Sequence, residues 1–467
     1  MRSRVVILGV LAALAAVILV IGIVAVAGAE QSNPLPAVSA SDLLAKMAQQ
    51  DQQTTSISGA VAWQNGLLGD LSALTGASGM HASASLPLVS NGSGRVWMSD
   101  GGARIESQAS GGDQIVVVNK AKREAWMYDY AANTAKHIVV TGTPAGGTAP
   151  SPVPTPAMAT PAAIDAFLQQ VSQYADVSVT GQGVVAGRDV YFLSMTPTAP
   201  DTALGSVQAA VDGKTYVPLQ LQVFAKGGAS PVIKFGFSSV SYDSIAASTY
   251  DFVPPAGTKV TTKTVDLSKA STHHKGIAGG HMSDPTTAQK SQMQQLLQRA
   301  LLTVPEAQKL VPFQLASAQG YTARPFDWAA VVDKGGPLTA VGKPLAALLQ
   351  ASGVFGGTDQ TKLSRPHGTG LGTSTATAAH MGPTAVLLYG KGFGTIVLAE
   401  TATTPALQKQ IEQLPALVDK TSVNGSTVRS FTTPLGGVYV WQKGDTTLVA
   451  GGMVTKADLQ AFVSSVQ

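Results

Sequence analysis

The chain contains no cysteine among its 467 residues. This absence excludes disulfide bonds, cysteine metal ligands, thiol catalysis and anchoring through a lipidated cysteine. The folded state must therefore be held together by side-chain packing and hydrogen bonds. Because 45% of the residues are apolar, a chain of this length can bury the cores of two or three domains.

Charged residues are also scarce. They make up 12% of the chain, which is about half the usual share, and the net charge is only +4. The lysines and arginines form no run and no stripe interleaved with aromatic residues. The sequence thus lacks the usual signature of nucleic-acid binding, and we expect no nucleic-acid partner.

No motif of a catalytic or metal site stands out. His273, His274 and His281 lie in Gly/Ser/Thr-rich sequence with Asp284 as the nearby carboxylate, which favours solvated histidines over a metal site. The glycine-rich turns lack the strand–loop–helix context of a phosphate loop, and no Gly-x-Ser-x-Gly element is present. We therefore expect a protein that is not an enzyme and that uses no cofactor and no metal.

One long apolar run is present at the N-terminus. Arg2 and Arg4 precede residues 5–28, which as a helix can cross a hydrocarbon core of about 30 Å. The arginines predict a cytoplasmic N-terminus and export of the rest, so we expect a single-pass membrane protein of the cell envelope. The length of the run favours an uncleaved anchor. The Ala-Gly-Ala before Glu30 is also an acceptable cleavage site, and cleavage after Ala29 would give a secreted protein.

Period-two alternation dominates the first half of the chain. Gly94–Asp100 and Ala103–Ser107 are predicted strands joined by Asp-Gly-Gly, a strong hairpin signal, and Gln114–Asn119 is a β-branched strand. Helical spacing of apolar residues predicts helices at Ser41–Gln50 and Ile164–Val171. About ten strands without α/β alternation indicate one large, curved antiparallel sheet.

The second half of the sequence predicts a smaller domain that contains both helices and strands. Ala288–Leu302 has an amphipathic helical pattern, and Pro305 can begin a further helix. Two hairpins are predicted, at Ala385–Ala399 and at Gly437–Ala450. Thr455 is predicted to cap the last helix of the chain.

Four segments in a fixed order carry a resemblance to a known family. They are KREAWMYDYAANTAKHI (Lys122–Ile138), GRDVYFLSMTP (Gly187–Pro197), AAVDGKTYVPLQLQVF (Ala209–Phe224) and FVPPAGTKV (Phe252–Val260). Together they resemble the LolA/LolB-like superfamily. That superfamily includes outer-membrane lipoprotein carriers, regulators of the RseB/MucB type and mycobacterial glycolipid carriers.

The resemblance implies an α+β protein with an open antiparallel β half-barrel and a helical lid. Tyr242–Val260 would be the terminal strand of the half-barrel, and an uncharacterised α+β domain would follow it. This chain departs from lipidated family members because it has no cysteine. The expected organisation is a signal anchor or signal peptide at 1–29, a spacer at 30–40, a LolA-like domain at 41–260, a linker at 261–285 and a C-terminal α+β domain at 286–467.

An incomplete barrel can bury acyl chains on one face if alternate positions of its strands are apolar. Ordinary core packing explains the same alternation, because periodicity identifies an apolar face without saying what it touches. Both interpretations apply to each candidate. The candidate lipid-lining residues are Ile57, Val61, Trp97, Trp126, Tyr128, Phe192, Leu219, Leu221, Val223, Phe235 and Phe237.

The resemblance implies an exported, non-enzymatic carrier or binding protein for lipid or lipoprotein acyl chains in the cell envelope. The same fold also suits a regulatory sensor that binds an envelope protein. A structural cell-surface protein without a ligand is a third possibility. The resemblance implies no function for the C-terminal domain.

Overall fold

The described residues of the computed structural model form two compact units. The first consists of residues 35–196 and 205–266, and the second of Pro197–Leu204 together with residues 303–467. The structure describes residues 35–50, 56–67, 91–109, 112–142, 164–165, 168–169, 171–266, 303–309, 311–325, 384–412 and 419–467.

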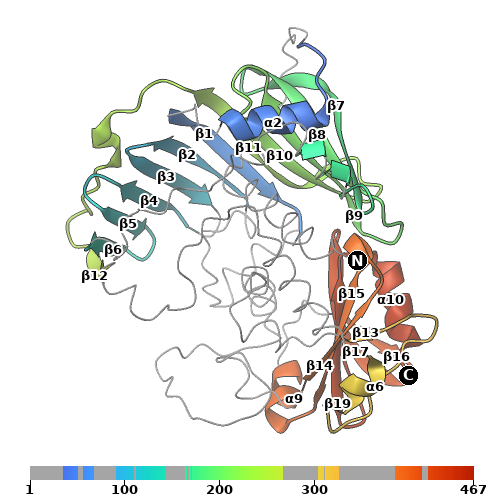
Figure 1. Cartoon of the computed structure of the whole chain (residues 1–467). Helices are drawn as coiled ribbons and strands as arrows, with labels where there is room; N and C mark the ends of the chain where they lie inside the picture. The colour runs from blue at the N-terminus through green and yellow to red at the C-terminus, as the bar shows by residue number, and fades with distance from the viewer. Residues whose placement is uncertain are drawn as a thin grey trace. The chain divides into compact units, whose positions relative to one another are not determined.

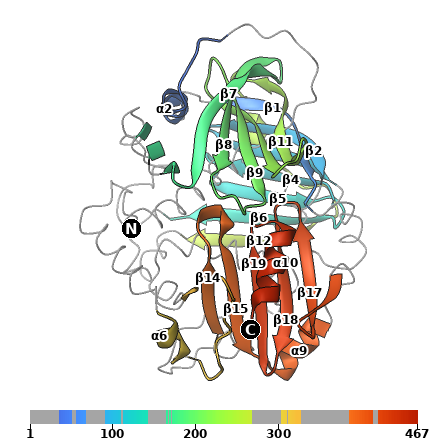
Figure 2. The ribbon, with the colours of Figure 1, turned by 90° about the vertical axis from the view of Figure 1, so that its right-hand side faces the viewer.

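The first unit is built around one twelve-stranded sheet, which is open and curved (Figures 1 and 2). The strand order is β12-β6-β5-β4-β3-β2-β1-β11-β10-β9-β8-β7, so β12 and β7 form its edges. The strands are β1 (Ser56–Asn65), β2 (Gly92–Ser99), β3 (Gly102–Ala109), β4 (Gln114–Asn119), β5 (Glu124–Asp129), β6 (Thr134–Thr141), β7 (Ala175–Val185), β8 (Arg188–Pro197), β9 (Leu204–Asp212), β10 (Pro218–Ala225), β11 (Pro231–Ser241) and β12 (Lys259–Asp266).

The predicted strands of this unit are confirmed in kind, with shifted ends. The predicted strand Gln114–Asn119 is β4 itself, and Asp100-Gly101 forms the turn between β2 and β3. Gly102 allows the next strand to pass closely, because a Cβ there would lie 2.0 Å from the carbonyl oxygen of Val118. The hairpin signal in the sequence therefore reflects a real steric requirement.

A β-bulge in β11 resets the alternation of that strand. Ala60 of β1 pairs with Ser239, whereas the next residue, Val61, pairs with Phe237, so Ser238 is an extra residue. Val240 therefore lies on the same face as Phe237, although three positions separate them. Both residues belong to one hydrophobic cluster.

The predicted helix at Ser41–Gln50 is confirmed as α2 (Ala40–Gln50). The Ser39 hydroxyl accepts a hydrogen bond from the backbone N–H of Asp42 at 3.0 Å, which is the usual capping interaction. Leu43 is fully buried and packs with Tyr191 and Leu193 of β8. Of the predicted helix at Ile164–Val171, Ile164 and Val171 are helical and buried.

The end of the first sheet differs from the prediction. Tyr242–Val260 is mostly not a strand; it contains the short 3-10 helix η2 (Ala247–Tyr250), and β12 begins only at Lys259. β12 then runs parallel to β6, whereas the other pairs with a described register in this sheet are antiparallel. The two prolines after Phe252 delay the strand, because proline donates no ladder hydrogen bond.

The second unit contains a seven-stranded sheet in the order β13-β14-β15-β19-β18-β17-β16. One hydrophobic cluster joins its strands to the last helix through Leu459, Phe462 and Val463. A smaller cluster places Leu407 and Ile411 of α9 against Val440. The elements are α6 (Val304–Gln308), β13 (Arg324–Pro325), β14 (Thr384–Tyr389), η3 (Gly392–Gly394), β15 (Ile396–Ala402), α9 (Pro405–Glu412), β16 (Asp419–Val423), β17 (Ser426–Thr433), β18 (Gly436–Lys443), β19 (Thr446–Gly452) and α10 (Lys456–Ser465).

Local predictions for the second unit are confirmed. Both hairpins form, as β14–β15 and β18–β19, and α6 has a proline in its first turn. The Thr455 hydroxyl accepts from the backbone N–H of Asp458 and caps α10. The predicted helix Ala288–Leu302 and the histidines at 273, 274 and 281 lie outside the described residues.

The described part of the chain is mostly β, with two sheets and few helices, where the sequence predicted an α+β class. None of its helices has the length and apolar character that crossing a bilayer requires. The apolar run at residues 5–28 lies outside the described residues.

Candidate functional site

The register of the strands divides the candidate lining residues between two faces of the first sheet. Val61 of β1 is paired with Phe237 of β11, and the face that carries both is called the Phe237 face. Trp97 of β2 is paired with Ser58 of β1, so Trp97 points to the opposite side. Trp126 lies on that opposite side as well, which is called the Trp126 face.

Eight of the eleven candidates lie together on the Phe237 face. Pairing places Leu221 beside Phe235, and Phe192 packs against the cluster that contains Phe237. The other three lie on the Trp126 face. On the Phe237 face are Ile57, Val61, Phe192, Leu219, Leu221, Val223, Phe235 and Phe237; on the Trp126 face are Trp97, Trp126 and Tyr128.

The part of the Phe237 face around β1 and β11 is closely packed. Phe237 is fully buried, and the ring of Trp63 lies 6.2 Å from that of Phe235. Gly92 makes room for the indole, since a Cβ at this position would be 2.4 Å from a ring carbon of Trp63. The buried indole N–H of Trp63 has no hydrogen-bond partner in the described part of the chain. This region is an apolar core with one free polar donor.

The same face becomes exposed along β3–β6. Two lines of paired residues, called the apolar rows, cross these strands and continue from Gly59 and Ile57 of β1. Ile105, Val118, Met127 and Ile138 are 37–41% exposed. The first row is Val96, Ile105, Val116 and Met127; the second is Met98, Ala103, Val118, Ala125 and Ile138.

The apolar rows are not evident in the sequence alone. Each strand alternates, so the strands themselves were predicted, but alternation offers two faces and does not say which is covered. The predicted candidates on the Trp126 face are tryptophan and tyrosine residues, which have large side chains. The exposed face carries smaller aliphatic residues and Met127 instead.

The Trp126 face of β2–β5 is closed by residues 245–252, called the strap. Tyr250 of the strap is 2% exposed and packs with Ile115 and Val117 of β4. Its hydroxyl lies 2.6 Å from Ser99 Oγ. Phe252 places its ring centroid 5.7 Å from that of Trp126, so the aromatic strand β5 and the Phe-x-Pro-Pro segment meet here.

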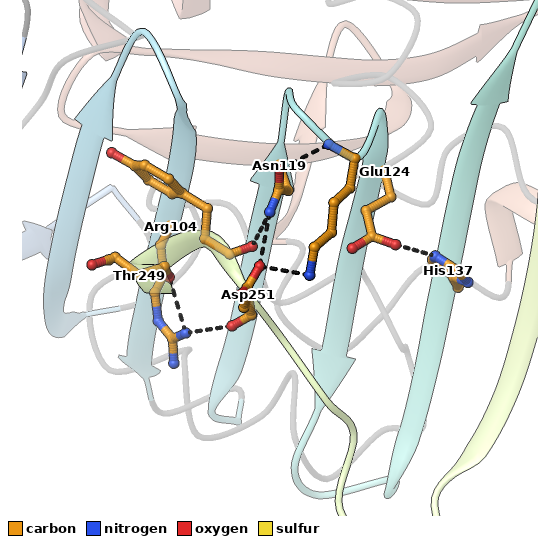
Figure 3. A network of polar contacts seen from close by, with 8 residues as sticks. Arg104, Asn119, Glu124, His137, Thr249 and Asp251 are labelled. Carbon is orange, nitrogen blue, oxygen red and sulfur yellow. Dashed lines mark hydrogen bonds and ion pairs between the residues drawn. The ribbon is translucent and has the colours of Figure 1, made fainter. Parts of the chain in front are cut away.

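Polar side chains fasten the strap at its edge (Figure 3). Arg104 donates to the carbonyl oxygens of Thr249 and Asp251 at 3.3 and 3.4 Å. Asn119 donates to the carbonyl oxygen of Tyr250 and to Asp251 Oδ1, at 3.2 and 3.0 Å. Lys122 forms an ion pair with Asp251 at 2.8 Å. These bonds hold residues 249–251 of the strap against the Trp126 face.

A further pair lies beside the strap. His137 Nε2 is 3.0 Å from Glu124 Oε2, and the imidazole stacks on the Trp126 indole with centroids 3.8 Å apart (Figure 3). The two ring planes are 8° apart, so the imidazole lies nearly parallel to the indole. The side chains of His137 and Glu124 are both 18% exposed, and the pair has a packing role that requires no chemistry.

An ion pair between a partly exposed arginine and a buried aspartate joins β8 to β9 near the β7 edge of the sheet. Arg188 makes two contacts with the Asp212 carboxylate, at 2.7 and 3.2 Å, and the Tyr242 hydroxyl donates to the same carboxylate. Burial acts to raise the pKa of Asp212, but hydrogen bonds from Arg188 and from the amides of Thr215 and Lys214 outweigh it, so the pKa is lowered. Burial raises the pKa of Tyr242, so its hydroxyl keeps its proton.

Glu400 is a buried carboxyl in the second sheet. It is fully buried, its Oε2 accepts from the backbone N–H of Ala316 at 2.9 Å, and its Oε1 has no partner in the described residues. Burial raises the pKa of Glu400 to about 7, against the lowering effect of the Ala316 hydrogen bond and the charge of Lys443. The hydroxyl of Tyr389 is likewise buried without a partner in the described part.

Within the described residues, no group of three or more histidine, aspartate or glutamate side chains could hold a metal ion. The titratable clusters at Asp212 and at Glu124–His137 have their hydrogen bonds made by neighbouring side chains or amides. The apolar rows are therefore the feature of the described residues that best suits a ligand.

No protein-family model matches the chain, and no curated protein matches it. Among solved structures, the MucA/MucB complex of Pseudomonas aeruginosa shares 14% identity and a TM-score of 0.36 over 92% of this chain and 98% of that one. A LolA-superfamily protein of Nitrosomonas europaea shares 11% identity and a TM-score of 0.18 over 46% of this chain and 99% of that one. A putative outer-membrane lipoprotein-sorting protein domain of Vibrio parahaemolyticus shares 11% identity and a TM-score of 0.17 over 43% and 91%.

The chain is thus similar to MucB over most of its length and to LolA-superfamily proteins over about half of it. These are the groups that the four sequence segments resemble. At such identities and TM-scores the similarity says nothing about a ligand. The function has to be inferred from the residues of this chain.

Proposed function

We propose that this chain is an exported, non-enzymatic binding protein that holds the acyl chains of a lipid or lipoprotein on its Phe237 face. The observation that carries the proposal is the pair of apolar rows, which are continuous with a buried core and exposed along β3–β6. The proposed export rests on the apolar run at residues 5–28, after two arginines.

Exposed apolar rows are costly for a protein without a ligand. Soluble proteins rarely leave large contiguous apolar patches in water, and such patches commonly mark binding surfaces. An acyl chain laid along the rows would be removed from water together with Ile105, Met127 and Ile138. Each buried CH₂ contributes about 0.8 kcal/mol, so one or two chains supply enough free energy for stable binding.

The direction and length of the apolar rows also suit a long acyl chain. From β1 to β6 the rows cross five strand spacings, a length of about 24 Å. Chains would lie across the strands, with their ends near the buried cluster around Phe237. The eight candidates on this face belong to or adjoin the packed core at which the rows would end. Trp97, Trp126 and Tyr128 do not belong to the proposed site, because the strap covers their face.

Lipid extraction from the purified full chain, followed by mass spectrometry, tests the proposal. Met127→Asp and Ile138→Asp together place two charges in the apolar rows at exposed positions, so folding should persist. We expect stoichiometric lipid from the wild type and loss of most of it from the double variant. Met453→Asp is the matched control, because Met453 of the second unit is 40% exposed against 41% for Met127.

A wild-type protein free of lipid would refute the proposal. Equal lipid retention in the double variant would refute the assignment to the Phe237 face. A lipid-free protein that binds an envelope protein tightly would instead support the sensor function.

A further inference from the structure

Three lysines lie on the Phe237 face at the β6–β12 edge of the sheet. Lys136 of β6 is paired with Met127 on one side and Thr261 on the other, and Lys263 of β12 is paired with Ile138. Lys259 lies four residues before Lys263 on β12, and side chains on a strand alternate with a period of two, so both lysines share one face. All three side chains are exposed.

Two of these lysines end the apolar rows. The first row runs through Val116 and Met127 and reaches Lys136 next. The second runs through Ala125 and Ile138 and reaches Lys263 next. Lys136 and Lys263 are diagonal neighbours on adjacent strands, with backbones about 8 Å apart. Each apolar row thus terminates in a cation at the same edge.

No carboxylate among the described residues of these strands forms an ion pair with the three lysines. Glu124 lies on the Trp126 face, where it contacts His137, and Asp266 lies on that face as well. Asp129 shares the face of the lysines, but its Oδ1 accepts a hydrogen bond from the backbone N–H of Ala132 in the adjacent turn, and it forms no ion pair with them. Among the described residues, the side chains of Lys136, Lys259 and Lys263 form no ion pair and no hydrogen bond.

Protection of a sheet edge is one use of exposed lysines. It accounts for lysines on β12, which is the edge strand, but not for Lys136 on β6, which is paired on both sides. The position of Lys136 at the end of an apolar row requires a different explanation.

We propose that the ligand of the Phe237 face is an amphiphile with an anionic headgroup, held at Lys136 and Lys263 while its acyl chain follows the apolar rows toward β1. This inference rests on the proposed function and narrows its ligand class. A phosphate or carboxylate headgroup at this edge would meet two ammonium groups, and its chain would begin at Met127 or Ile138. Lys259 adds positive potential four residues away from Lys263 on the same strand.

Two lysolipids with the same acyl chain provide the test. The binding of radiolabelled lysophosphatidylglycerol and lysophosphatidylcholine to the full chain would be measured by equilibrium dialysis in one nonionic detergent. We expect about tenfold tighter binding of the anionic lipid at low ionic strength. The preference should shrink with added salt, and inorganic phosphate should reduce it no more than chloride does at the same ionic strength.

Lys136→Gln with Lys263→Gln should remove this preference, because the affinity for lysophosphatidylglycerol should fall to that for lysophosphatidylcholine. The matched control is Lys409→Gln with Lys420→Gln, which removes the same charge from exposed positions of the second unit. Equal binding of the two lipids by the wild type, or a preference that survives the first double variant, would overturn the inference while the proposed function stands. Binding of neither lipid would overturn both.

Discussion

The two faces of the first sheet use the same strands in opposite ways. On the Trp126 face, the strap covers β2–β5 and its polar groups are bonded by Arg104 and Asn119. On the Phe237 face of β3–β6, four large apolar side chains are exposed. In β4 the contrast lies between neighbours, because Val117 is fully buried and Val118 is 37% exposed.

This difference shows where binding free energy is available. A face already covered by its own chain has little apolar surface left to bury, so a ligand would first have to displace the strap. The Phe237 face still has that surface, and its polar neighbours are the lysines at the edge. Substitutions on either face of the sheet can test this difference.

The largest effect is expected from Tyr250→Ala in the strap. The substitution removes a fully buried ring and its hydrogen bond to Ser99, and should lower the free energy of unfolding by about 3–5 kcal/mol. Urea denaturation would measure it. Tyr130→Ala is the control, since Tyr130 is 52% exposed on the same face, and should cost much less. Similar losses for the two would show that the strap does not close the face.

Glu400 tests the effect of complete burial in the second unit, because its carboxyl is fully buried. Its pKa is about 7 in the folded protein against 4.5 without burial, so the folded state holds the proton more tightly. The free energy of unfolding should therefore fall by about 3 kcal/mol as the pH rises from 4.5 to above 7.

Glu400→Gln should abolish that pH dependence and stabilise the second unit at pH values above 7. Thermal unfolding at acidic and alkaline pH would measure the effect. Glu412→Gln, at an exposed position near the end of α9, is the control and should leave the pH dependence in place. An unchanged slope in Glu400→Gln would show that this carboxyl is not the buried group responsible.

Val117 and Val118 test the contrast within one strand. Val117→Ala removes two buried methyl groups and should cost about 2 kcal/mol of stability with little effect on lipid binding. Val118→Ala should have a smaller effect on stability and weaken lipid binding. Denaturation and lipid retention measured on both variants would separate the faces. Weaker lipid binding by Val117→Ala, with unchanged binding by Val118→Ala, would contradict the proposed site on the Phe237 face.

The smallest stability effect is expected at the edge of the strap. Asn119→Ala leaves the carbonyl oxygen of Tyr250 without its donor and should cost about 1–2 kcal/mol. Lys122→Gln breaks the exposed ion pair with Asp251 and should cause no measurable loss. Denaturation of the two variants side by side would rank them. A larger loss from Lys122→Gln would mean that charge, and not the amide, fastens the strap.

Much of the local structure was predictable from the sequence. Gln114–Asn119 has the β-branched pattern of a strand, Asp100-Gly101 a turn signal and Thr455 a capping position, and each is confirmed. These predictions succeed because their causes act over a few residues. The terminal strand was misplaced because Tyr242–Val260 forms contacts with β4 and β5 that are distant in sequence.

The strand register was needed to assign the candidate residues to the two faces of the sheet. Trp97 and Ile57 are both large apolar residues on alternating strands, and only the pairing of Ser58 with Trp97 separates them onto opposite faces. A shift of one residue would exchange the faces. The bulge at Ser238 has the same consequence within one strand.

By itself, the sequence determined which segments alternate, where turns and caps form, and that no cysteine takes part in holding or anchoring the chain. The tertiary structure decided which of the two alternating faces the strap covers and which is left apolar and exposed. The physical reason is that alternation makes every strand two-sided, whereas burial depends on contacts between residues more than a hundred positions apart, such as Asn119 and Tyr250.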